Sequence, residues 1–194
     1  MVLLGIDPGL DGGLAFIEVS SISSSSLNGV KLFVMPTYYE SKYKTKIFKN
    51  GVRKKICKRK IDSKKLNEIL ISNRPDVVFI EKVSSRPGEG NVSSFTFGFG
   101  AGLLEGLMVA NNLTYYYVSP VKWSSFFAKE VPHSNPKIRS QMYVDKYYPD
   151  INFFVGPRSK VPHSGLVDAF MIGLYGKLHL HKNTRYLETE FTFE

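Results

Sequence analysis

Hydrophobic positions occur along the first part of the chain in short runs that predict strands. Val2–Ile6, Gly13–Val19 and Val30–Pro36 are apolar runs separated by turn-forming or Ser-rich segments, which predicts three consecutive strands with a hairpin between the first two. Asp76–Ile80 is a short, continuous apolar run, typical of a central strand buried on both faces, and Leu113–Val118 predicts another strand.

Helical spacing of apolar residues follows in the remaining segments. Ser63 and Ser164 stand where N-caps are expected. Four glycines in the second predicted helix, at positions 98, 100, 102 and 106, indicate that this helix packs closely on the sheet, and Lys82–Ser94 before it is expected to be a loop. The predicted helices are Ser63–Ser72, Phe95–Asn112, Pro136–Tyr148 and Gly165–Leu180. This order of elements predicts an α/β or α+β protein with a mixed sheet.

A strongly basic segment interrupts this pattern. Tyr38–Asp62 alternates basic with apolar residues on both sides of Lys49-Asn50-Gly51, and Asn-Gly is a strong hairpin signal. Between Lys42 and Lys65 twelve Lys or Arg residues face only one acid, whereas the net charge of the whole chain is +9. We expect a basic β-hairpin at about residues 38–62 that binds a polyanion, with a solvated loop or a localisation signal as the alternatives. The candidate phosphate contacts are Arg53, Lys54, Lys55, Lys58, Arg59 and Lys60.

Several classes of protein are disfavoured by composition. A single cysteine, Cys57, excludes an internal disulfide framework. The N-terminal segment lacks the basic and apolar regions of a signal peptide, and no apolar run approaches the roughly 20 residues that span a bilayer. We expect a soluble, intracellular protein without a membrane partner, in a bacterial cytoplasm or in an organelle or viral compartment.

Three carboxylates end or interrupt apolar stretches. Asp7 follows the first strand, Glu81 follows the central strand, and Asp168 lies within the last helix. If the two strands are neighbours and the helix crosses their ends, the three acids meet with no obvious basic partner, and divalent ions such as Mg²⁺ would relieve their repulsion. Two such ions can act on a phosphodiester. Taken singly, Asp7 can be a turn residue, Glu81 can cap the loop or pair with Lys82, and Asp168 can favour the helix dipole.

The same residues resemble the RuvC family of Holliday junction resolvases, in its phage and plastid branch. GIDPGLDGGLAFI (residues 5–17) resembles the opening strand, turn and strand, VVFIEKV (77–83) the glutamate motif, and HSGLVDAFMIGLYG (163–176) the C-terminal helix. Segments around VSPVKW (118–123) and Lys137 are also similar, so that the likeness covers most of residues 2–178 apart from the basic insert.

This resemblance implies an RNase H-like (retroviral integrase-like) fold with a five-stranded mixed sheet, in a nuclease domain over residues 1–180 with a tail over 181–194. It implies a homodimer that cuts opposing strands of a four-way DNA junction with two Mg²⁺ ions per active site, for which Mn²⁺ would substitute. Asp7, Glu81 and Asp168 would be the catalytic metal ligands.

One position departs from the family. Many members carry an acid or a histidine three residues before the last aspartate, where this chain has Gly165. His163, just before the helix, could serve instead as a ligand or as a general acid, or could be an exposed loop residue. If His163 has no such role, water or Asp11 would supply the fourth ligand, although Asp11 is more typical of a turn.

Other residues are candidates for DNA contact. Lys122 and Lys137 would reach the backbone, and Arg86 and Phe95 follow Glu81 in a segment that would overlook the active site, where an aromatic ring could stack on a base. Phe97 and Trp123 are expected to be core residues.

Three rival functions remain open from the sequence. A ribonuclease H or a transposase would share the carboxylates and differ in substrate. A sugar kinase or ATPase of the actin type has a similar first loop, but it needs a second phosphate loop for which this chain shows no motif. A junction-binding protein with a decayed site would not be expected to keep all three acids.

Overall fold

The computed structural model describes residues 1–22, 26–47, 51, 53–83 and 90–183, and the side chains of residues 41–47, 53–57, 91–93 and 181–183 lie outside that description. Five strands form one mixed sheet in the order β3-β2-β1-β6-β7. The first three strands are antiparallel neighbours, whereas β6 is parallel to both β1 and β7. The strands are β1 (Val2–Asp7), β2 (Gly13–Glu18), β3 (Gly29–Val34), β6 (Val77–Glu81) and β7 (Thr114–Val118).

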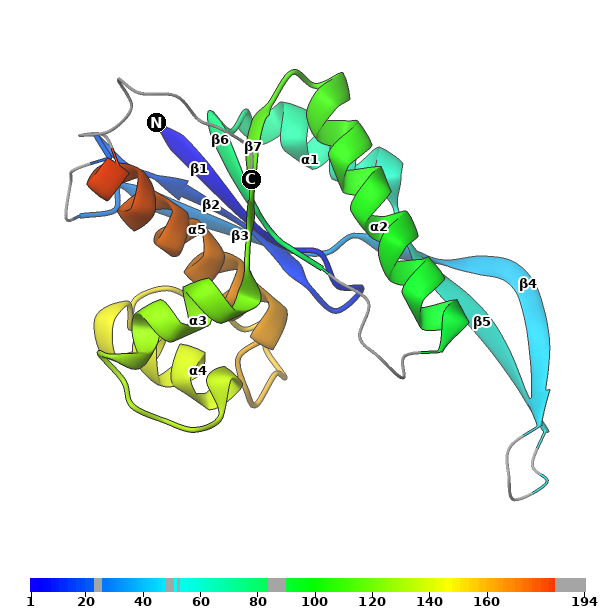
Figure 1. Cartoon of the computed structure of the whole chain (residues 1–194). Helices are drawn as coiled ribbons and strands as arrows, with labels where there is room; N and C mark the ends of the chain where they lie inside the picture. Colours follow the sequence, from blue (N-terminus) through cyan, green and yellow to red (C-terminus); the bar gives the residue numbers. More distant parts are fainter. Residues whose placement is uncertain (23–25, 48–50, 52, 84–89, 184–194) are drawn as a thin grey trace.

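Helices cover both faces of this sheet, as the buried strands require. In β1, Leu3 packs with one core cluster and Leu4 with the other, because successive side chains point to opposite faces. Helices α1 and α2 lie on one side and α3, α4 and α5 on the other (Figure 1). The helices are α1 (Ser63–Asn73), α2 (Asn91–Ala110), α3 (Pro120–Ala128), α4 (Pro136–Tyr147) and α5 (Ser164–Asn183).

The basic segment forms the predicted hairpin. Strands β4 (Thr37–Ile47) and β5 (Arg53–Ile61) pair antiparallel as a separate two-stranded sheet, which projects beyond the body of the protein (Figure 1). Ile61 at its base is buried in the core with α1 and β1. Gly51 has a φ of 76°, a left-handed conformation that suits glycine. The other two residues of the predicted turn, 49 and 50, lie outside the described residues.

Five details of the predicted elements were wrong. The N-cap of α1 is Asp62, whose side chain accepts a hydrogen bond from the Lys65 backbone N–H at 3.0 Å. Ser164 is the first residue of α5 and not its cap, and this helix runs to Asn183, three residues beyond its predicted end at Leu180. Helix α2 begins at Asn91, inside the predicted loop, and helix α3 was not predicted at all.

The helix that touches the sheet closely is α5 and not α2. A Cβ added to Gly98, Gly102 or Gly106 of α2 would meet no other atom within 4 Å. By contrast, a Cβ on Gly5 of β1 would lie 2.0 Å from the carbonyl oxygen of Ala169 in α5. The prediction of a close, glycine-mediated contact therefore holds for a different helix, the one that carries Asp168. No helix in the described ranges has the length and apolar character to cross a bilayer.

Candidate active site

Asp7 stands at the end of β1, where the chain turns into β2. Its Cα lies opposite that of Gly13, and its Oδ1 accepts a hydrogen bond from the Gly9 backbone N–H at 3.1 Å. The Gly12 N–H donates to the Gly9 carbonyl at 2.9 Å and closes the turn. Burial raises the pKa of Asp7, although the Gly9 N–H and the nearby Lys137 act in the opposite direction. The carboxylate is thus fixed in place but costly to ionise.

Helix α5 brings Asp168 close to Asp7, because the backbone of α5 packs directly against the turn that follows Asp7. A Cβ on Gly165 would lie 2.2 Å from the carbonyl oxygen of Asp11, in the turn that follows Asp7. Burial raises the pKa of Asp168 to about 7, and repulsion by Asp7 and Glu81 adds to this shift, while Lys137 and the Ser140 hydroxyl lower it. The three predicted acids therefore lie close enough to interact through their charges.

Removing the charge of Asp168 should stabilise the protein at alkaline pH. The carboxyl of Asp168 has a pKa of about 7 in the folded protein, against 3.8 for an aspartate in an unfolded chain. Between these two pH values, Asp168 is protonated in the folded state and ionised in the unfolded state. The wild type therefore loses stability as the pH rises from about 4 to 7. We expect Asp168→Asn to raise the free energy of unfolding by about 2–4 kcal/mol at pH 8 and by little at pH 4, as measured by urea denaturation.

The control is Asp150→Asn, which removes an exposed carboxylate. Its free energy of unfolding should stay near that of the wild type at both pH values. Equal effects of the two substitutions at pH 8 would mean that the environment of Asp168 is not special.

Glu81 closes β6 beside the end of β7. The Lys82 N–H donates to the Val118 carbonyl at 2.8 Å, which keeps the two strand ends together. Glu81 Oε1 accepts a hydrogen bond from Nε1 of Trp123 in α3 at 3.0 Å. Trp123 is buried, as predicted for a core residue, but its contact with the glutamate was not foreseen, since nothing in its sequence context distinguishes a structural indole from one that holds an acid.

The donor chemistry of this site fits a hard divalent cation. Asp7, Glu81 and Asp168 supply carboxylate oxygens, the ligands that Mg²⁺ prefers. The prediction that the acids lack a basic neighbour was wrong, because Lys137 acts on Asp7 and Asp168, although neither acid forms an ion pair with it in the described chain. Among the described residues, no three His, Cys, Asp or Glu side chains are already arranged as a metal site. A cation would therefore have to draw the side chains closer together.

His163 lies beside the acids, just before α5. Its backbone N–H donates to the Phe153 carbonyl at 2.9 Å, and its own carbonyl accepts from the first turn of the helix. Its Nδ1 is buried and has no hydrogen-bond partner in the described structure, which is unusual for a buried polar atom. His163 also lowers the pKa of Asp7. An unsatisfied ring nitrogen next to carboxylates suits a metal ligand or a proton donor better than it suits an exposed loop residue.

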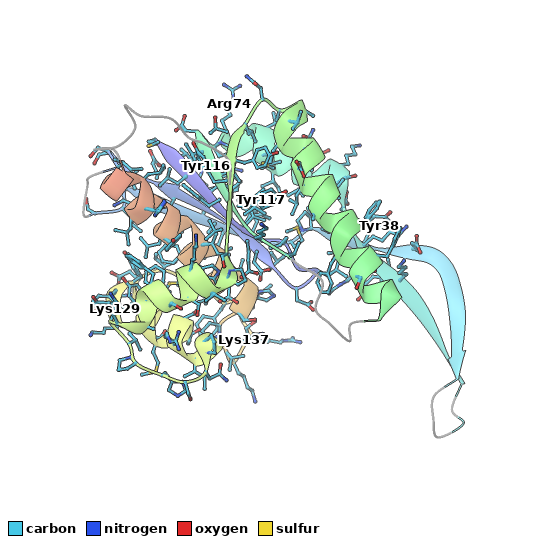
Figure 2. All side chains as sticks on the ribbon, in the orientation of Figure 1. Tyr38, Arg74, Tyr116, Tyr117, Lys129 and Lys137 are labelled. Carbon is cyan, nitrogen blue, oxygen red and sulfur yellow. The ribbon has the colours of Figure 1, made fainter. Side chains whose placement is uncertain are left out.

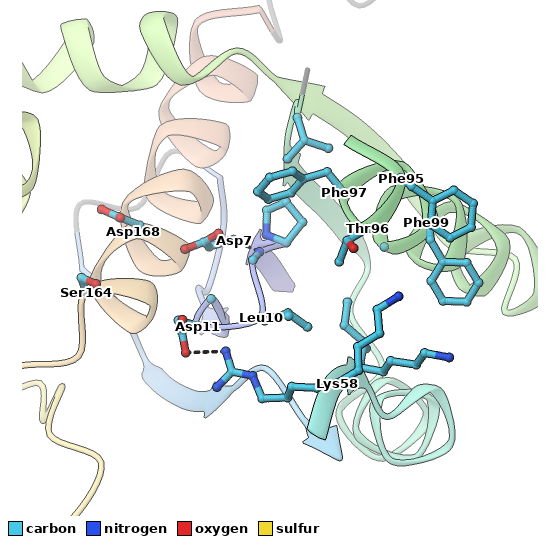
Figure 3. Close-up of a pocket in the computed structure, with 18 of the residues that line it drawn as sticks. Asp7, Leu10, Asp11, Lys58, Phe95, Thr96, Phe97, Phe99, Ser164 and Asp168 are labelled. Atoms are coloured by element: carbon cyan, nitrogen blue, oxygen red, sulfur yellow. Dashed lines mark hydrogen bonds and ion pairs between the residues drawn. The ribbon is translucent and has the colours of Figure 1, made fainter. Parts of the chain in front are cut away.

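A pocket of about 660 Å³ opens over Asp7 and Asp168. Figure 3 shows Asp7 and Asp168 on one side of it, Lys58 on another, and phenylalanines of α2 on a third. Phe95 is 67% exposed and stacks on Phe99 with ring centroids 6.5 Å apart. Phe97 is also exposed, at 44%, so the prediction that it belongs to the core was wrong. The pocket thus combines carboxylates with a basic wall and an aromatic wall.

Solved structures of two Holliday junction resolvases share this architecture. Thermus thermophilus RuvC, solved in complex with a Holliday junction substrate, matches with a TM-score of 0.54 at 17% identity, over 95% of this chain and 98% of that chain. The fold is that of RuvC. The yeast mitochondrial Holliday junction resolvase matches with a TM-score of 0.50 at 13% identity, over 96% and 84% of the two chains. No protein-family model and no curated protein matches the sequence. The predicted mixed five-stranded sheet flanked by helices is confirmed.

On this RuvC fold, the base of the hairpin adjoins the acidic turn. Arg59 donates to Asp11 at 2.6 Å, and Lys60 pairs with Glu40. Asp11 is 84% exposed and held by Arg59, which makes it a turn residue tied to the hairpin and a poor fourth ligand. Lys58 lines the pocket and is exposed. Two of the three basic side chains at the hairpin base are thus already engaged with acids.

The other predicted DNA contacts fall in different places. Lys137, at the start of α4, lines the pocket, and Figure 2 shows it on the side of the sheet that α3 and α4 cover. Lys122 is exposed on α3 but does not line this pocket. Arg86 lies outside the described residues, and Arg53, Lys54 and Lys55 belong to β5, with side chains that also lie outside them.

Proposed function

We propose that this protein is a metal-dependent endonuclease that resolves four-way DNA junctions by paired nicks on opposing strands. The observation that carries the proposal is the pair of half-buried, mutually repelling carboxylates, Asp7 and Asp168, in a pocket walled by basic and aromatic side chains. The RuvC fold supports it, since both similar structures are Holliday junction resolvases.

Asp7, Glu81 and Asp168 would hold two Mg²⁺ ions, for which Mn²⁺ would substitute. Such ions supply an activated water and neutralise the charge that develops on the phosphodiester. His163 would complete the ligand set or protonate the leaving oxygen through its unsatisfied ring nitrogen. Lys137 lies near both aspartates without forming an ion pair with either, and it would bind a phosphate of the DNA backbone.

The hairpin and α2 would hold the DNA on either side of the cut. The phosphates would lie along the base of the hairpin, beside Lys58, and an exposed ring such as Phe95 would stack on a base where the strands separate. Arg59 and Lys60 would first have to leave their internal acids, so they should add less to phosphate binding than Lys58 does.

This difference predicts the salt dependence of binding. Replacing Lys58 with Gln should lower the slope of log K against log salt by about one, because one released counterion is lost. Lys60→Gln should lower the slope by clearly less, since part of that charge is already neutralised by Glu40. Fluorescence anisotropy of a labelled four-way junction between about 50 and 200 mM salt would measure both slopes. Equal slopes for the two variants would contradict the ion-pair argument.

A homodimer would let two such sites act on opposing strands. Beyond Phe95, one exposed stripe of α2 consists of Phe99 and Val109 together with glycines 98, 102 and 106, and nothing else in the described chain lies within 4 Å of a Cβ placed on these glycines. An apolar stripe that lets another helix approach closely suits a second copy of the chain. Sedimentation velocity of the intact chain would give its association state.

The test of the proposed function is a nicking assay on three substrates: a synthetic four-way junction, a linear duplex and an RNA–DNA hybrid, each with Mg²⁺ or with EDTA. We expect symmetric nicks only in the junction and only with Mg²⁺. Preferential cutting of the hybrid would indicate a ribonuclease H. Tight junction binding without nicks in Mg²⁺ would indicate a non-catalytic junction-binding protein.

A further inference from the structure

The indole of Trp123 contacts one of the three acids of the site. Its Nε1 donates a hydrogen bond to Glu81 Oε1 at 3.0 Å, and the residue is only 6% exposed. A hydrogen bond to a charged group is stronger than one between neutral groups. The carboxylate that would bind a cation is therefore held at one oxygen by a side chain from a different element.

The fold fixes this indole in place from several directions. Strand β7 ends at Val118, directly opposite Glu81, and α3 begins at Pro120, so the chain turns back across the end of β6. The Trp123 backbone N–H donates to the Ser119 carbonyl at 3.2 Å in the first turn of α3. The ring then packs in the core cluster that contains Phe127 of α3 and Phe170 of α5. The position of the donor is thus set by core packing and cannot adjust freely to the carboxylate.

The chemical nature of the donor matters at this point. A lysine or an arginine in place of Trp123 would neutralise Glu81 and compete with a divalent cation for it. An indole N–H donates a hydrogen bond but carries no charge and accepts none. It can therefore restrict the rotation of the carboxylate without adding a positive charge that would compete with a metal ion. Second contacts of this kind orient metal ligands in other proteins.

We propose that Trp123 is a positioning residue that holds Glu81 in the orientation needed to bind a divalent cation. This inference rests on the proposed function, because it assumes that Glu81 is a metal ligand. It goes further in assigning a role to a residue outside the acidic set. A purely structural Trp123 would support the core, and its N–H would matter only because a buried indole needs some partner.

The test measures metal binding directly, with Mn²⁺ as the probe and isothermal titration calorimetry on the full chain. Trp123→Phe should weaken Mn²⁺ binding about tenfold, because a hydrogen bond to a charged group is lost. Junction affinity in EDTA should stay unchanged. Tyr115→Phe is the matched control, since it removes an aromatic donor from a different carboxylate, Glu105, at 3.1 Å, and it should leave Mn²⁺ affinity at the wild-type value.

A second variant separates the hydrogen bond from the packing. Trp123 is the single tryptophan of the chain, so a site-specific replacement by 3-benzothienylalanine changes only its N–H to sulfur and keeps the shape of the ring. This variant should melt closer to the wild type than Trp123→Phe does, because the ring still fills the core, and it should match Trp123→Phe in Mn²⁺ affinity. The single indole also provides a signal, because Mn²⁺ bound beside it should quench its fluorescence in the wild type and not in Glu81→Gln.

The outcomes distinguish the two proposals. Wild-type protein that cuts junctions and binds Mn²⁺, together with a benzothienylalanine variant of unchanged Mn²⁺ affinity, would overturn the role of Trp123 and leave the nuclease intact. Wild-type protein that neither binds Mn²⁺ nor cuts a junction would overturn both.

Discussion

Asp7→Asn is expected to slow junction cleavage by about a thousandfold or more, because a lost metal ligand removes several kcal/mol of transition-state stabilisation. Junction binding should persist, since the basic hairpin is untouched. The substitution is mild for the fold: an asparagine oxygen can still accept the hydrogen bond from the Gly9 N–H. Single-turnover cleavage with Mg²⁺ and a gel-shift assay in EDTA would measure the two effects separately.

The matched control lies four residues away in the same turn. Asp11→Asn removes an exposed carboxylate that pairs with Arg59 rather than with the other acids. Its cleavage rate should stay within about tenfold of the wild type, because an exposed ion pair contributes little. If Asp7→Asn cut junctions at the wild-type rate, or if Asp11→Asn lost as much activity, Asp7 would have no special place in the mechanism.

Much of the sheet and of the candidate site could be predicted, because the apolar runs in the sequence correspond to the buried strands of the structure. The apolar runs that precede Asp7 and Glu81 are buried strands in adjacent, parallel positions, so both carboxylates come to one edge of the sheet. Asp168 required one further assumption, that the last helix crosses this edge, and its repulsion with Asp7 and Glu81 agrees with that assumption.

Features that depend on distant partners could not be predicted in the same way. Glycines in α2 and α5 look alike in the sequence, but only in α5 do glycines face backbone, Gly165 at the turn after β1 and Gly173 at β1 itself, and this difference depends on tertiary packing. Phe97 is a large aromatic residue of the kind that usually belongs to a core, but it is exposed at the pocket. Its part of α2 runs past the sheet toward the hairpin (Figure 1). The nearness of Lys137 to the acids arises from α4, far along the chain from Asp7.

Electrostatic partners of the hairpin were equally hidden. A count of charges treats Lys58, Arg59 and Lys60 as equivalent, whereas the structure engages two of them with acids. The same limit applies to the acids. From the sequence, Asp11 is a possible metal ligand, and only the structure shows that its carboxylate pairs with Arg59 of β5. Net charge therefore indicated the class of partner but not which side chains are available to it.

Gly165→Asp is expected to inactivate and destabilise the protein, although it adds an acid at the position where many members of the RuvC family, which this sequence resembles, carry one. The added Cβ would lie 2.2 Å from the Asp11 carbonyl oxygen and 2.6 Å from the Gly12 Cα, and neither backbone atom can move without shifting the turn that holds Asp7. We expect a loss of about 3 kcal/mol or more in the free energy of unfolding, at the upper end of the cost of overpacking. Asp168, three residues further along α5, would withdraw from Asp7 at the same time.

Gly165→Ala separates the effect of the Cβ from that of the charge and should lose nearly as much stability as Gly165→Asp. Gly156→Ala serves as the control, because a Cβ there meets nothing within 4 Å and the residue has no left-handed backbone conformation. Thermal denaturation and junction cleavage of the three variants would measure both consequences. Near-wild-type stability of Gly165→Ala would show that α5 does not need this close contact. Steric exclusion would then not explain why position 165 carries glycine and not an acid. If the contact is needed, no side chain fits at Gly165, and in the proposed mechanism His163 or water would complete the ligand set.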